Sequence, residues 1–514
     1  MNTVITKKEV KVSFILIGII LAEKVLSFLK NIVFAYYFGA QSSMDLYYLA
    51  TNIVSLFNVC FCVSIPMAFL TIFINKGLRS ATVKKQETVM SNTISAFLCI
   101  AIVLTVILII VAPWMEDVVV PSISTAESQR LSTYIRLLSF IVILYCFSGL
   151  LSASLECLEN YIPSKLTSFF VSFSSVIFAV LLGKKFGAIV AVYGSLCGIG
   201  LHAIYAYLIL RKKRKIQLQW PKFDENVKSI LSLSIPMMVS VAITSINSLV
   251  DKLIAVKIGE GTVSALNYAS LLSRELISGV LVMAISSIVA SRFSENILQR
   301  DFNSLNKNIN LILYTMLLIV FPLMIFYFTY TDEIIGFVFE RGAFDLKAKS
   351  LTISAFTGYI FGLFFLPFRE IFIRVQYAYQ DSRGPMINSL ISVLVNVFFS
   401  IVLGFKFGII GISLATSIAT IINCILSYYW IKRTKIFDIK LNFIMFSKLT
   451  FNLMIVWLIA SFVKFNINDS VFATLFFAFI GIFICFMIVT YFTNKMFFIN
   501  ALLFFKNKGN RLDL

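Results

Sequence analysis

The sequence is poor in charge. Charged residues make up 13% of the 514 residues and hydrophobic residues 59%, and the mean hydropathy of +0.92 excludes a soluble globular protein. The eight cysteines show neither zinc-site spacing nor a paired extracytoplasmic arrangement, so we expect small core residues. The one histidine, His202, lies in an apolar run, which favours a packed residue over a metal ligand or a base. We therefore predict no metal site.

What the sequence does contain is a series of apolar runs of membrane length. About fourteen runs approach 20 residues, enough to cross roughly 30 Å of hydrocarbon as a helix. The predicted spans are 13–37, 47–74, 91–113, 132–156, 164–182, 187–210, 229–256, 265–290, 309–330, 350–376, 386–404, 409–431, 447–464 and 470–493. The predicted fold class is an all-α polytopic membrane protein with about 14 transmembrane helices.

The basic residues predict how the chain is oriented. Lysine and arginine number 44 against 25 acidic residues, a net charge of +19, and they collect in short loops such as the run Arg211–Lys215. We favour a topological role for that run over a lipid-headgroup or nucleotide site. By the positive-inside rule, and with an even number of spans, both termini are expected in the cytoplasm. The first span follows Lys7 and Lys8 with no cleavage site after it, so we expect it to be retained.

An internal repeat divides the chain. Leu158–Leu196 matches Tyr379–Ser417 at an offset of about 220 residues, with Gly183 opposite Gly404 and Gly187 opposite Gly408. Because six spans separate each pair, the two halves share one orientation, as in parallel-repeat transporters with a substrate site between the halves. The predicted domains are two six-helix halves, 1–215 and 216–435, and a region 436–514 with two added helices. Those two helices form either a groove or a packing accessory.

Charges inside the spans gather in a few helices. They are Glu23, Lys24, Lys30, Asp251, Lys252, Arg274, Glu275, Arg369, Glu370 and Arg374. Charges at that depth are costly unless they face water or a partner, so they indicate a cavity. The excess of lysine in span one suits an anion and favours a phosphate-bearing substrate. The alternative is neutralising pairs that fix helix packing, such as Glu370 with Arg374 four residues on.

Evidence for catalysis is thin. The predicted extracytoplasmic loops are too short for a catalytic domain, and no glycine-rich phosphate loop follows a strand pattern. We therefore predict that the protein is not an enzyme, uses no cofactor and is not driven directly by ATP.

Four stretches carry a resemblance to a known family. They are Lys24–Lys30 leading to Phe38-Gly39-Ala40 and Asp45-Leu46-Tyr47, Ile235–Asp251, Phe339–Asp345 and Tyr377–Pro385. With fourteen spans in two halves, the chain resembles the MurJ (MviN) lipid II flippases of the multidrug/oligosaccharidyl-lipid/polysaccharide exporter superfamily. The resemblance implies a bacterial plasma-membrane protein that accepts an undecaprenyl-pyrophosphate-linked saccharide and moves it to the outer leaflet by alternating access. It also implies substrate binding by Lys24, Lys30 and Asp45.

The chain departs from the family pattern at several positions. The family's second-span arginine falls at Asn58, its following Glu-Gly pair at Val63-Ser64, and its span-eight arginine near Leu271, with Arg274 one turn further on. Asn58 and Arg274 therefore complete the predicted substrate-binding set. These departures leave open another lipid-linked sugar, such as a capsule, exopolysaccharide, O-antigen or teichoic-type repeat unit.

Three classes of function follow from these patterns. The first is the flippase, with lipid II favoured as substrate; the second is a drug or cation antiporter; the third is a membrane scaffold for cell-envelope enzymes. Asp251 and Asp381 are candidates for coupling to sodium, protons or the membrane potential, although Asp381 would equally well cap a helix. The expected partners are the lipid-linked saccharide, the bilayer and cell-envelope synthesis enzymes, with no nucleic acid.

Overall fold

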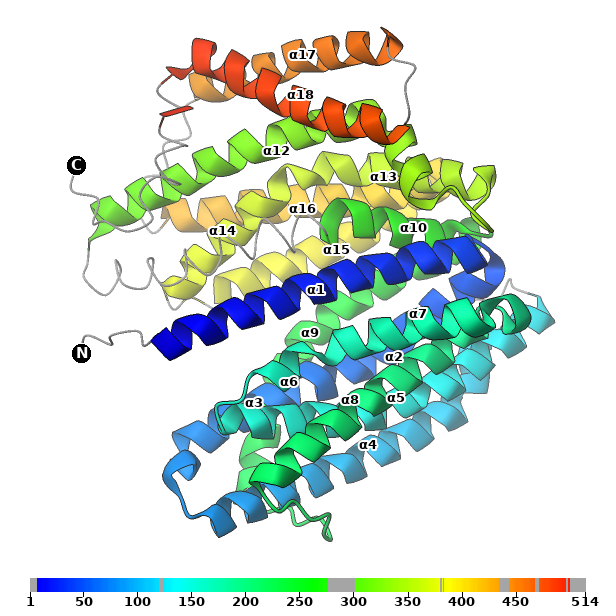
Figure 1. Ribbon diagram of the computed structural model, residues 1–514, viewed down its shortest axis with the longest axis vertical. Helices are drawn as coiled ribbons and strands as arrows, with labels where there is room; N and C mark the ends of the chain where they lie inside the picture. Colours follow the sequence, from blue (N-terminus) through cyan, green and yellow to red (C-terminus); the bar gives the residue numbers. More distant parts are fainter. Residues whose placement is uncertain are drawn as a thin grey trace. The chain divides into compact units, whose positions relative to one another are not determined.

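The structure is a computed structural model that describes residues 7–119, 124–275, 301–379, 381, 383–433, 443–466, 471–495 and 498–499 (Figure 1). Within these ranges the chain forms helices and connecting loops and contains no β-strand. By its internal contacts it divides into two compact units. Unit 1 comprises Met1–Ser264 and Arg341–Ala348, and unit 2 comprises Ala265–Glu340 and Lys349–Leu514.

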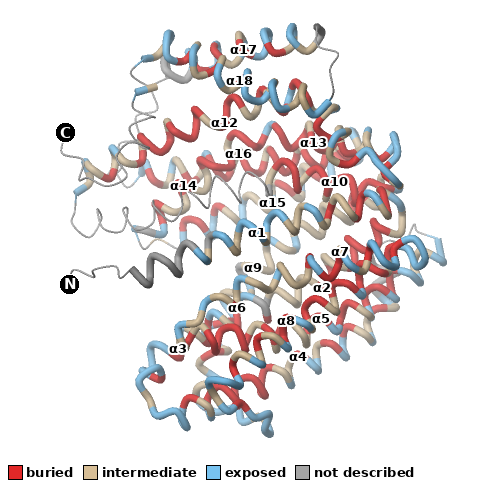
Figure 2. Tube along the Cα trace, viewed as in Figure 1, coloured by how far each residue is buried: buried red, intermediate tan, exposed pale blue. Residues whose placement is uncertain are grey.

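Unit 1 contains the first helices of the chain. They are α1 (Lys7–Phe38), α2 (Ser42–Val59), a π-helix (Cys60–Ser64), α3 (Ile65–Asn75), α4 (Val83–Val119), α5 (Thr125–Cys157), α6 (Ile162–Lys165), α7 (Thr167–Phe186), α8 (Ile189–Lys213) and α9 (Glu225–Ile258). Buried residues concentrate on α5 and α8 (Figure 2). By contrast, α4 exposes Ile102, Val103, Ile107 and Ile110. A helix that is apolar on its exposed face suits contact with lipid chains.

Unit 2 contains the later helices, and α10 (Thr262–Ser270) crosses the boundary between the units. They are a second π-helix (Leu271–Glu275), α12 (Phe302–Phe339), α13 (Leu346–Leu363), α14 (Phe365–Ala378), α15 (Arg383–Phe407), α16 (Ile409–Arg433), α17 (Phe443–Asn466) and α18 (Val471–Thr493). The helices α12 and α16 are largely buried, whereas α15, α17 and α18 are largely exposed (Figure 2). Unit 2 therefore also combines buried helices with apolar helices that face outward.

The predicted fold class is confirmed. In the described ranges, ten helices are long and apolar enough to cross a membrane, or eleven if α13 and α14, which bend by 44°, form one span. The count falls below fourteen partly because a π-helix divides the second predicted span into α2 and α3. The eighth predicted span, 265–290, begins in α10 and runs on past Glu275 into residues outside the described ranges.

The internal repeat is visible in the backbone of each unit. The helix α7 ends at Phe186 before Gly187 with φ 68°, and α15 ends at Phe407 before Gly408 with φ 69°. In each case the turn to the next helix requires a positive φ, which glycine adopts without strain. The compact units nevertheless divide the chain at Ser264, because α9 packs on α2, α3 and α4. The domain boundaries predicted from the repeat stay a prediction.

Candidate functional site

A π-helix follows α2 in the first half, and another follows α10 in the second half. One covers Cys60–Ser64 after α2, and the other covers Leu271–Glu275 after α10. Such segments are rare and frequently occur at functional sites. They cover positions at which the sequence departs from the family pattern, since Val63-Ser64 lies in the first π-helix and Leu271 in the second, while Asn58 lies just before the first. The sequence analysis did not predict this feature.

Around the first π-helix, two polar side-chain atoms are buried without a hydrogen-bond partner in the described ranges. The Asn58 side-chain oxygen and the Ser64 hydroxyl make no hydrogen bond in the part of the chain that the structure describes. Leaving such groups unsatisfied costs about 1–3 kcal/mol each. Asn58 is therefore suited to a polar ligand or an ordered water molecule.

Polar contacts join α1, α2 and α9 within unit 1. The Tyr48 hydroxyl donates to Asn31 on α1 at 3.3 Å, and the Ser248 hydroxyl on α9 donates to the Asn52 side-chain oxygen at 3.0 Å. The Lys252 ammonium lies 5.9 Å from the centroid of the Tyr48 ring. Asp251, half-buried, precedes Lys252 on α9. These contacts bring polar side chains of α1, α2 and α9 together within unit 1.

The two predicted lysines lie on α1. Lys24 is exposed, and half-buried Lys30 has its ammonium 5.9 Å from the centroid of the Phe34 ring. Six residues separate them, or about 9 Å along a helix. An exposed lysine in an apolar helix needs water or an anion beside it. Both lysines are thus placed where an anionic group has access from outside the protein core.

Asp45 lies apart from Asn58. Its buried carboxylate accepts hydrogen bonds from the Gly261 amide at 2.6 Å and from the Ser264 amide and hydroxyl at 2.7 and 2.6 Å. These bonds cap the first turn of α10, whose early amides have no partner within the helix. Asn58 follows thirteen residues later on the same helix, α2, which is about 20 Å along its axis. Substrate binding by Asp45 stays a prediction, and the capping role is one that the sequence did not reveal.

The loop after α12 closes on the end of α1. The Ala343 amide donates to the Tyr36 carbonyl at 2.8 Å. A Cβ atom at Gly342, which has φ 63°, would lie 2.3 Å from the Tyr36 carbonyl oxygen, and one at Gly39, with φ 60°, would lie 2.2 Å from the Ala343 carbonyl oxygen. Two stretches that carried the family resemblance are thus joined by a backbone contact that only glycine permits.

Arg274 lies in unit 2. Its guanidinium is 6.0 Å from the centroid of the Tyr359 ring. It lines a small pocket with Tyr359, Gly362, Leu363, Leu366, Thr416, Ser417 and Thr420. The hydroxyl groups of Thr416, Ser417 and Thr420 each donate to a backbone carbonyl, at 3.3, 2.7 and 2.8 Å. The charged donor at this pocket is therefore the Arg274 guanidinium, which is suited to an anion.

Asp381 has the contacts of a helix cap. Its carboxylate accepts from the amides of Arg383 and Gly384, each at 3.0 Å, at the start of α15, and also from the Trp430 indole. This matches the alternative to ion coupling stated above. On α14, Glu370 pairs with its neighbour Arg369, where the spacing had suggested Arg374.

An apolar cavity of about 320 Å³ lies among α12, α17 and α18. It is lined by Tyr330, Val456, Ile459, Ala460, Val463, Phe477, Ala478, Gly481, Ile482 and Cys485. The two helices outside the repeat therefore form a groove with α12, one of the two alternatives predicted for them. The sequence did not indicate that α12 would supply the third wall.

His202 is a packed residue, as predicted. It is fully buried, and its Nε2 donates to the Pro163 carbonyl at 2.8 Å, so its Nδ1 accepts from the Ser148 hydroxyl at 2.6 Å. Among the cysteines that the structure describes, Cys146, Cys157 and Cys424 are buried and unbonded, as predicted. Cys99 is exposed, and Cys197 and Cys485 are partly exposed, so the prediction of core residues is wrong for Cys99.

Solved structures define the class of protein. The chain superposes on the lipid II flippase MurJ in an inward closed conformation with a TM-score of 0.78, 22% identity and coverage of 96% of this chain and 99% of that chain. It superposes on an inward-facing MATE family transporter of the MOP superfamily with a TM-score of 0.69, 16% identity and coverage of 80% and 94%. The chain is a multi-pass membrane protein with the fold of these transporters.

Sequence comparison then defines the family. The family model described as lipid II flippase MurJ matches residues 34–487, and the chain belongs to that family. A probable lipid II flippase MurJ of Treponema pallidum is 23% identical over 426 residues, 80% of each chain. One of Thermotoga maritima is 25% identical over 464 residues, 90% of this chain and 92% of that protein. The family predicted from the sequence is confirmed, and it is a family of transporters rather than enzymes.

Proposed function

We propose that this protein is a flippase that moves lipid II, a polyprenyl-pyrophosphate-linked saccharide, from the cytoplasmic to the outer leaflet by alternating access. The observation that carries the proposal is that one chain combines basic side chains on its helices with an apolar cavity that α12 forms with the two helices outside the repeat. An amphiphile with an anionic head and a hydrocarbon tail needs both features. Membership of the family supports the same substrate class.

In this proposal the basic residues bind the pyrophosphate. Within unit 1, Lys24 and Lys30 supply compact charges on α1, and within unit 2, Arg274 supplies a guanidinium; each is a candidate contact for a phosphate group. Lysine and arginine both serve phosphate, the first as a point charge and the second as a planar fork. Asn58, with its unsatisfied side-chain oxygen, accepts a donor from the sugar or from bound water.

The cavity among α12, α17 and α18 is the proposed place for the hydrocarbon chain. Its walls are formed almost wholly by aliphatic and aromatic side chains. A polyprenyl tail that enters it exchanges lipid contacts for protein contacts and carries no polar group that needs a partner. We further propose a plasma-membrane location with both termini in the cytoplasm, on the strength of the basic loops.

The test removes the two lysines of α1. Lys24→Ala with Lys30→Ala is expected to abolish lipid II translocation, and growth of a strain that depends on this protein, because the pyrophosphate loses its counter-charges. The matched control is Lys184→Ala with Lys185→Ala, which removes two exposed lysines from the last turn of α7. Unchanged translocation and growth in the first variant, at normal abundance, would contradict the proposal.

A second candidate substrate is the lipid-linked repeat unit of another polysaccharide. The observation that favours it is Asn58, which stands where the family pattern has an arginine and so removes one positive charge. Mass spectrometry of the lipid that copurifies distinguishes the two, because they share the polyprenyl pyrophosphate and differ in the sugar. Recovery of a repeat unit and no lipid II would replace the first candidate by the second.

A further inference from the structure

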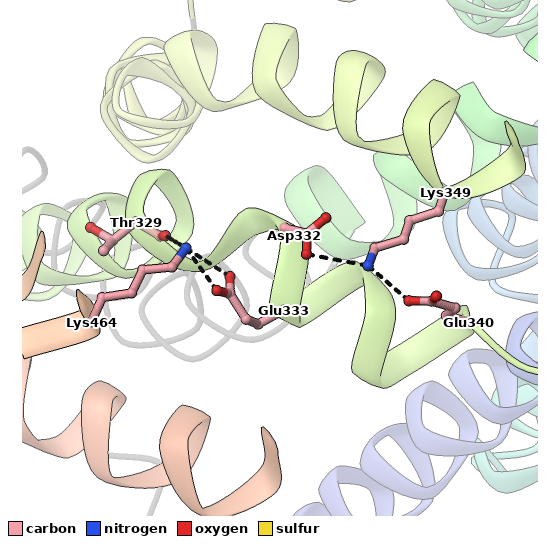
Figure 3. Close-up of polar contacts among 6 residues, drawn as sticks. All are labelled: Thr329, Asp332, Glu333, Glu340, Lys349 and Lys464. Atoms are coloured by element: carbon pink, nitrogen blue, oxygen red, sulfur yellow. Dashed lines mark hydrogen bonds and ion pairs between the residues drawn. The ribbon is translucent and has the colours of Figure 1, made fainter. Parts of the chain in front are cut away.

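The last turn of α17 is tied to α12 through one side chain. The Lys464 ammonium lies 2.7 Å from one carboxylate oxygen of Glu333 and 3.0 Å from the other, and it donates to the Thr329 carbonyl at 2.7 Å (Figure 3). It also lies 5.3 Å from the centroid of the Tyr330 ring. Three groups of α12 therefore converge on a single lysine.

These three groups lie at a break in α12. Tyr330 has φ −117° and ψ 25°, which is not helical. Breaks of this kind leave backbone groups to be satisfied from outside the helix, and the carbonyl that Lys464 binds belongs to the residue just before the break. The adjacent Thr329 hydroxyl is buried and has no partner within the described ranges. Lys464 therefore contacts a backbone carbonyl directly before the break, next to a hydroxyl group that has no partner among the described residues.

The segment beyond the break is held from its other side as well. Lys349 on α13 lies 3.2 Å from Asp332, on the terminal part of α12, and 2.8 Å from Glu340, the residue after its end (Figure 3). The side chains of Lys464 and Glu333 are 34% and 25% exposed. Because water or lipid headgroups have access to this pair, it separates at lower cost than a fully buried pair.

The contact of Lys464 with α12 also lies at one end of the apolar cavity. Tyr330 and Val463 line the cavity, and they are the chain neighbours of Thr329 and Lys464. Lys464 thus joins two of the three helices that form the cavity wall, while α18 supplies the third. Any separation of α12 from α17 at this point widens the cavity.

We propose that the contact of Lys464 with Glu333 and Thr329 is a latch that keeps one end of this cavity narrow. When the latch is released, the terminal segment of α12 turns at Tyr330 and widens the cavity for a hydrocarbon chain. The identity of that chain as the tail of the transported lipid rests on the proposed function. The latch itself does not, because it is defined by contacts within unit 2.

A native thiol reports on the latch. Cys485 lines the cavity, whereas Cys197 lies on α8 and has a similar partial exposure. The experiment treats the purified full-length protein in lipid vesicles, without substrate, with a lipid-soluble maleimide. Peptide mass spectrometry then measures the labelling rate of each cysteine. Because no substrate is present, the result does not depend on what the protein transports.

The variants distinguish release of the latch from a loss of packing throughout the protein. Lys464→Met and Glu333→Gln are each expected to raise the labelling rate of Cys485 several-fold and leave that of Cys197 unchanged. Lys464→Arg is expected to stay near the wild-type rate. The exchange of both charges in Lys464→Glu with Glu333→Lys is expected to restore the rate only in part, because a carboxylate at position 464 cannot donate to the Thr329 carbonyl. The matched control is Lys448→Met, which removes an exposed lysine near the other end of α17.

Two outcomes would overturn the proposal. One is a Cys485 rate that stays at the wild-type value in Lys464→Met while the variant keeps its melting temperature. The other is an equal rise at Cys197, which would indicate loss of structure throughout the chain. Loss of lipid translocation in Lys24→Ala with Lys30→Ala, together with an unaffected Cys485 rate in the latch variants, would leave the proposed function intact and reject the latch.

Discussion

Asp45 shows how a single buried residue joins two helices that lie far apart in the sequence. Its carboxylate takes up three donors from Gly261 and Ser264, more than 200 positions along the chain. The sequence analysis identified this acid by its position after the Phe38-Gly39 turn. It did not reveal the partners, because a carboxylate carries no information about which distant amides will face it. A residue that resembles a family's functional acid can therefore also be a structural cap.

Replacing Asp45 tests the capping role directly. Asp45→Ala is expected to lower the free energy of unfolding by about 1–3 kcal/mol, because it leaves buried amides of α10 without an acceptor. Asp45→Asn keeps one acceptor oxygen and is expected to lower it less. Thermal unfolding in detergent measures both. The control is Glu225→Ala, whose exposed side chain makes a surface ion pair with Lys76 at 3.8 Å and is expected to have little effect.

At the scale of elements, hydropathy predicted where helices lie but not how they are interrupted. Apolar runs and the repeated Lys-Phe-Gly turns were sufficient to locate α7, α8, α15 and α16. The π-helices at Cys60–Ser64 and Leu271–Glu275 were not predicted, because one widened turn leaves the apolar pattern unchanged. The cavity was only partly predicted, because its walls combine α12 with helices that follow more than a hundred residues later.

The loop from Arg341 to Asp345 gives a prediction at this scale. Gly342→Ala would place a Cβ 2.3 Å from the Tyr36 carbonyl oxygen, at a residue with φ 63°. We expect it to lower the free energy of unfolding by more than the roughly 1 kcal/mol that positive φ alone costs, and to weaken the contact between the loop and α1. Thermal unfolding and protease sensitivity of the loop measure these effects.

The matched control for this loop is Gly200→Ala in α8. No heavy atom would lie within 4 Å of the added Cβ, and the residue has a helical backbone. Alanine is a better helix former than glycine, so this variant is expected to be as stable as the wild type or slightly more stable. Equal melting temperatures for the two alanine variants would show that the close approach at Gly342 is unimportant.

For the whole molecule, the open question is what drives transport. Asp251 and Asp381 were both candidates for ion coupling, and the contacts of Asp381 with the start of α15 and with Trp430 occupy its carboxylate as a cap. We therefore favour Asp251, which lies on α9 beside Lys252 and on the helix that packs on α2. A membrane potential supplies about 2.3 kcal/mol per charge per 100 mV, so one coupled charge biases transport strongly.

The corresponding prediction concerns reconstituted vesicles. Translocation by the wild type is expected to change when a sodium gradient, a proton gradient or a potential is imposed. Asp251→Asn is expected to remove that dependence and leave substrate copurification unchanged, because it deletes a charge without touching Lys24, Lys30 or Arg274. Asp381→Asn, which weakens a cap, is expected instead to lower the melting temperature and keep the dependence on ions. A wild type indifferent to sodium, pH and potential alike would exclude coupling through either residue. The free-energy difference between the two leaflets would then have to come from synthesis and consumption of the lipid itself.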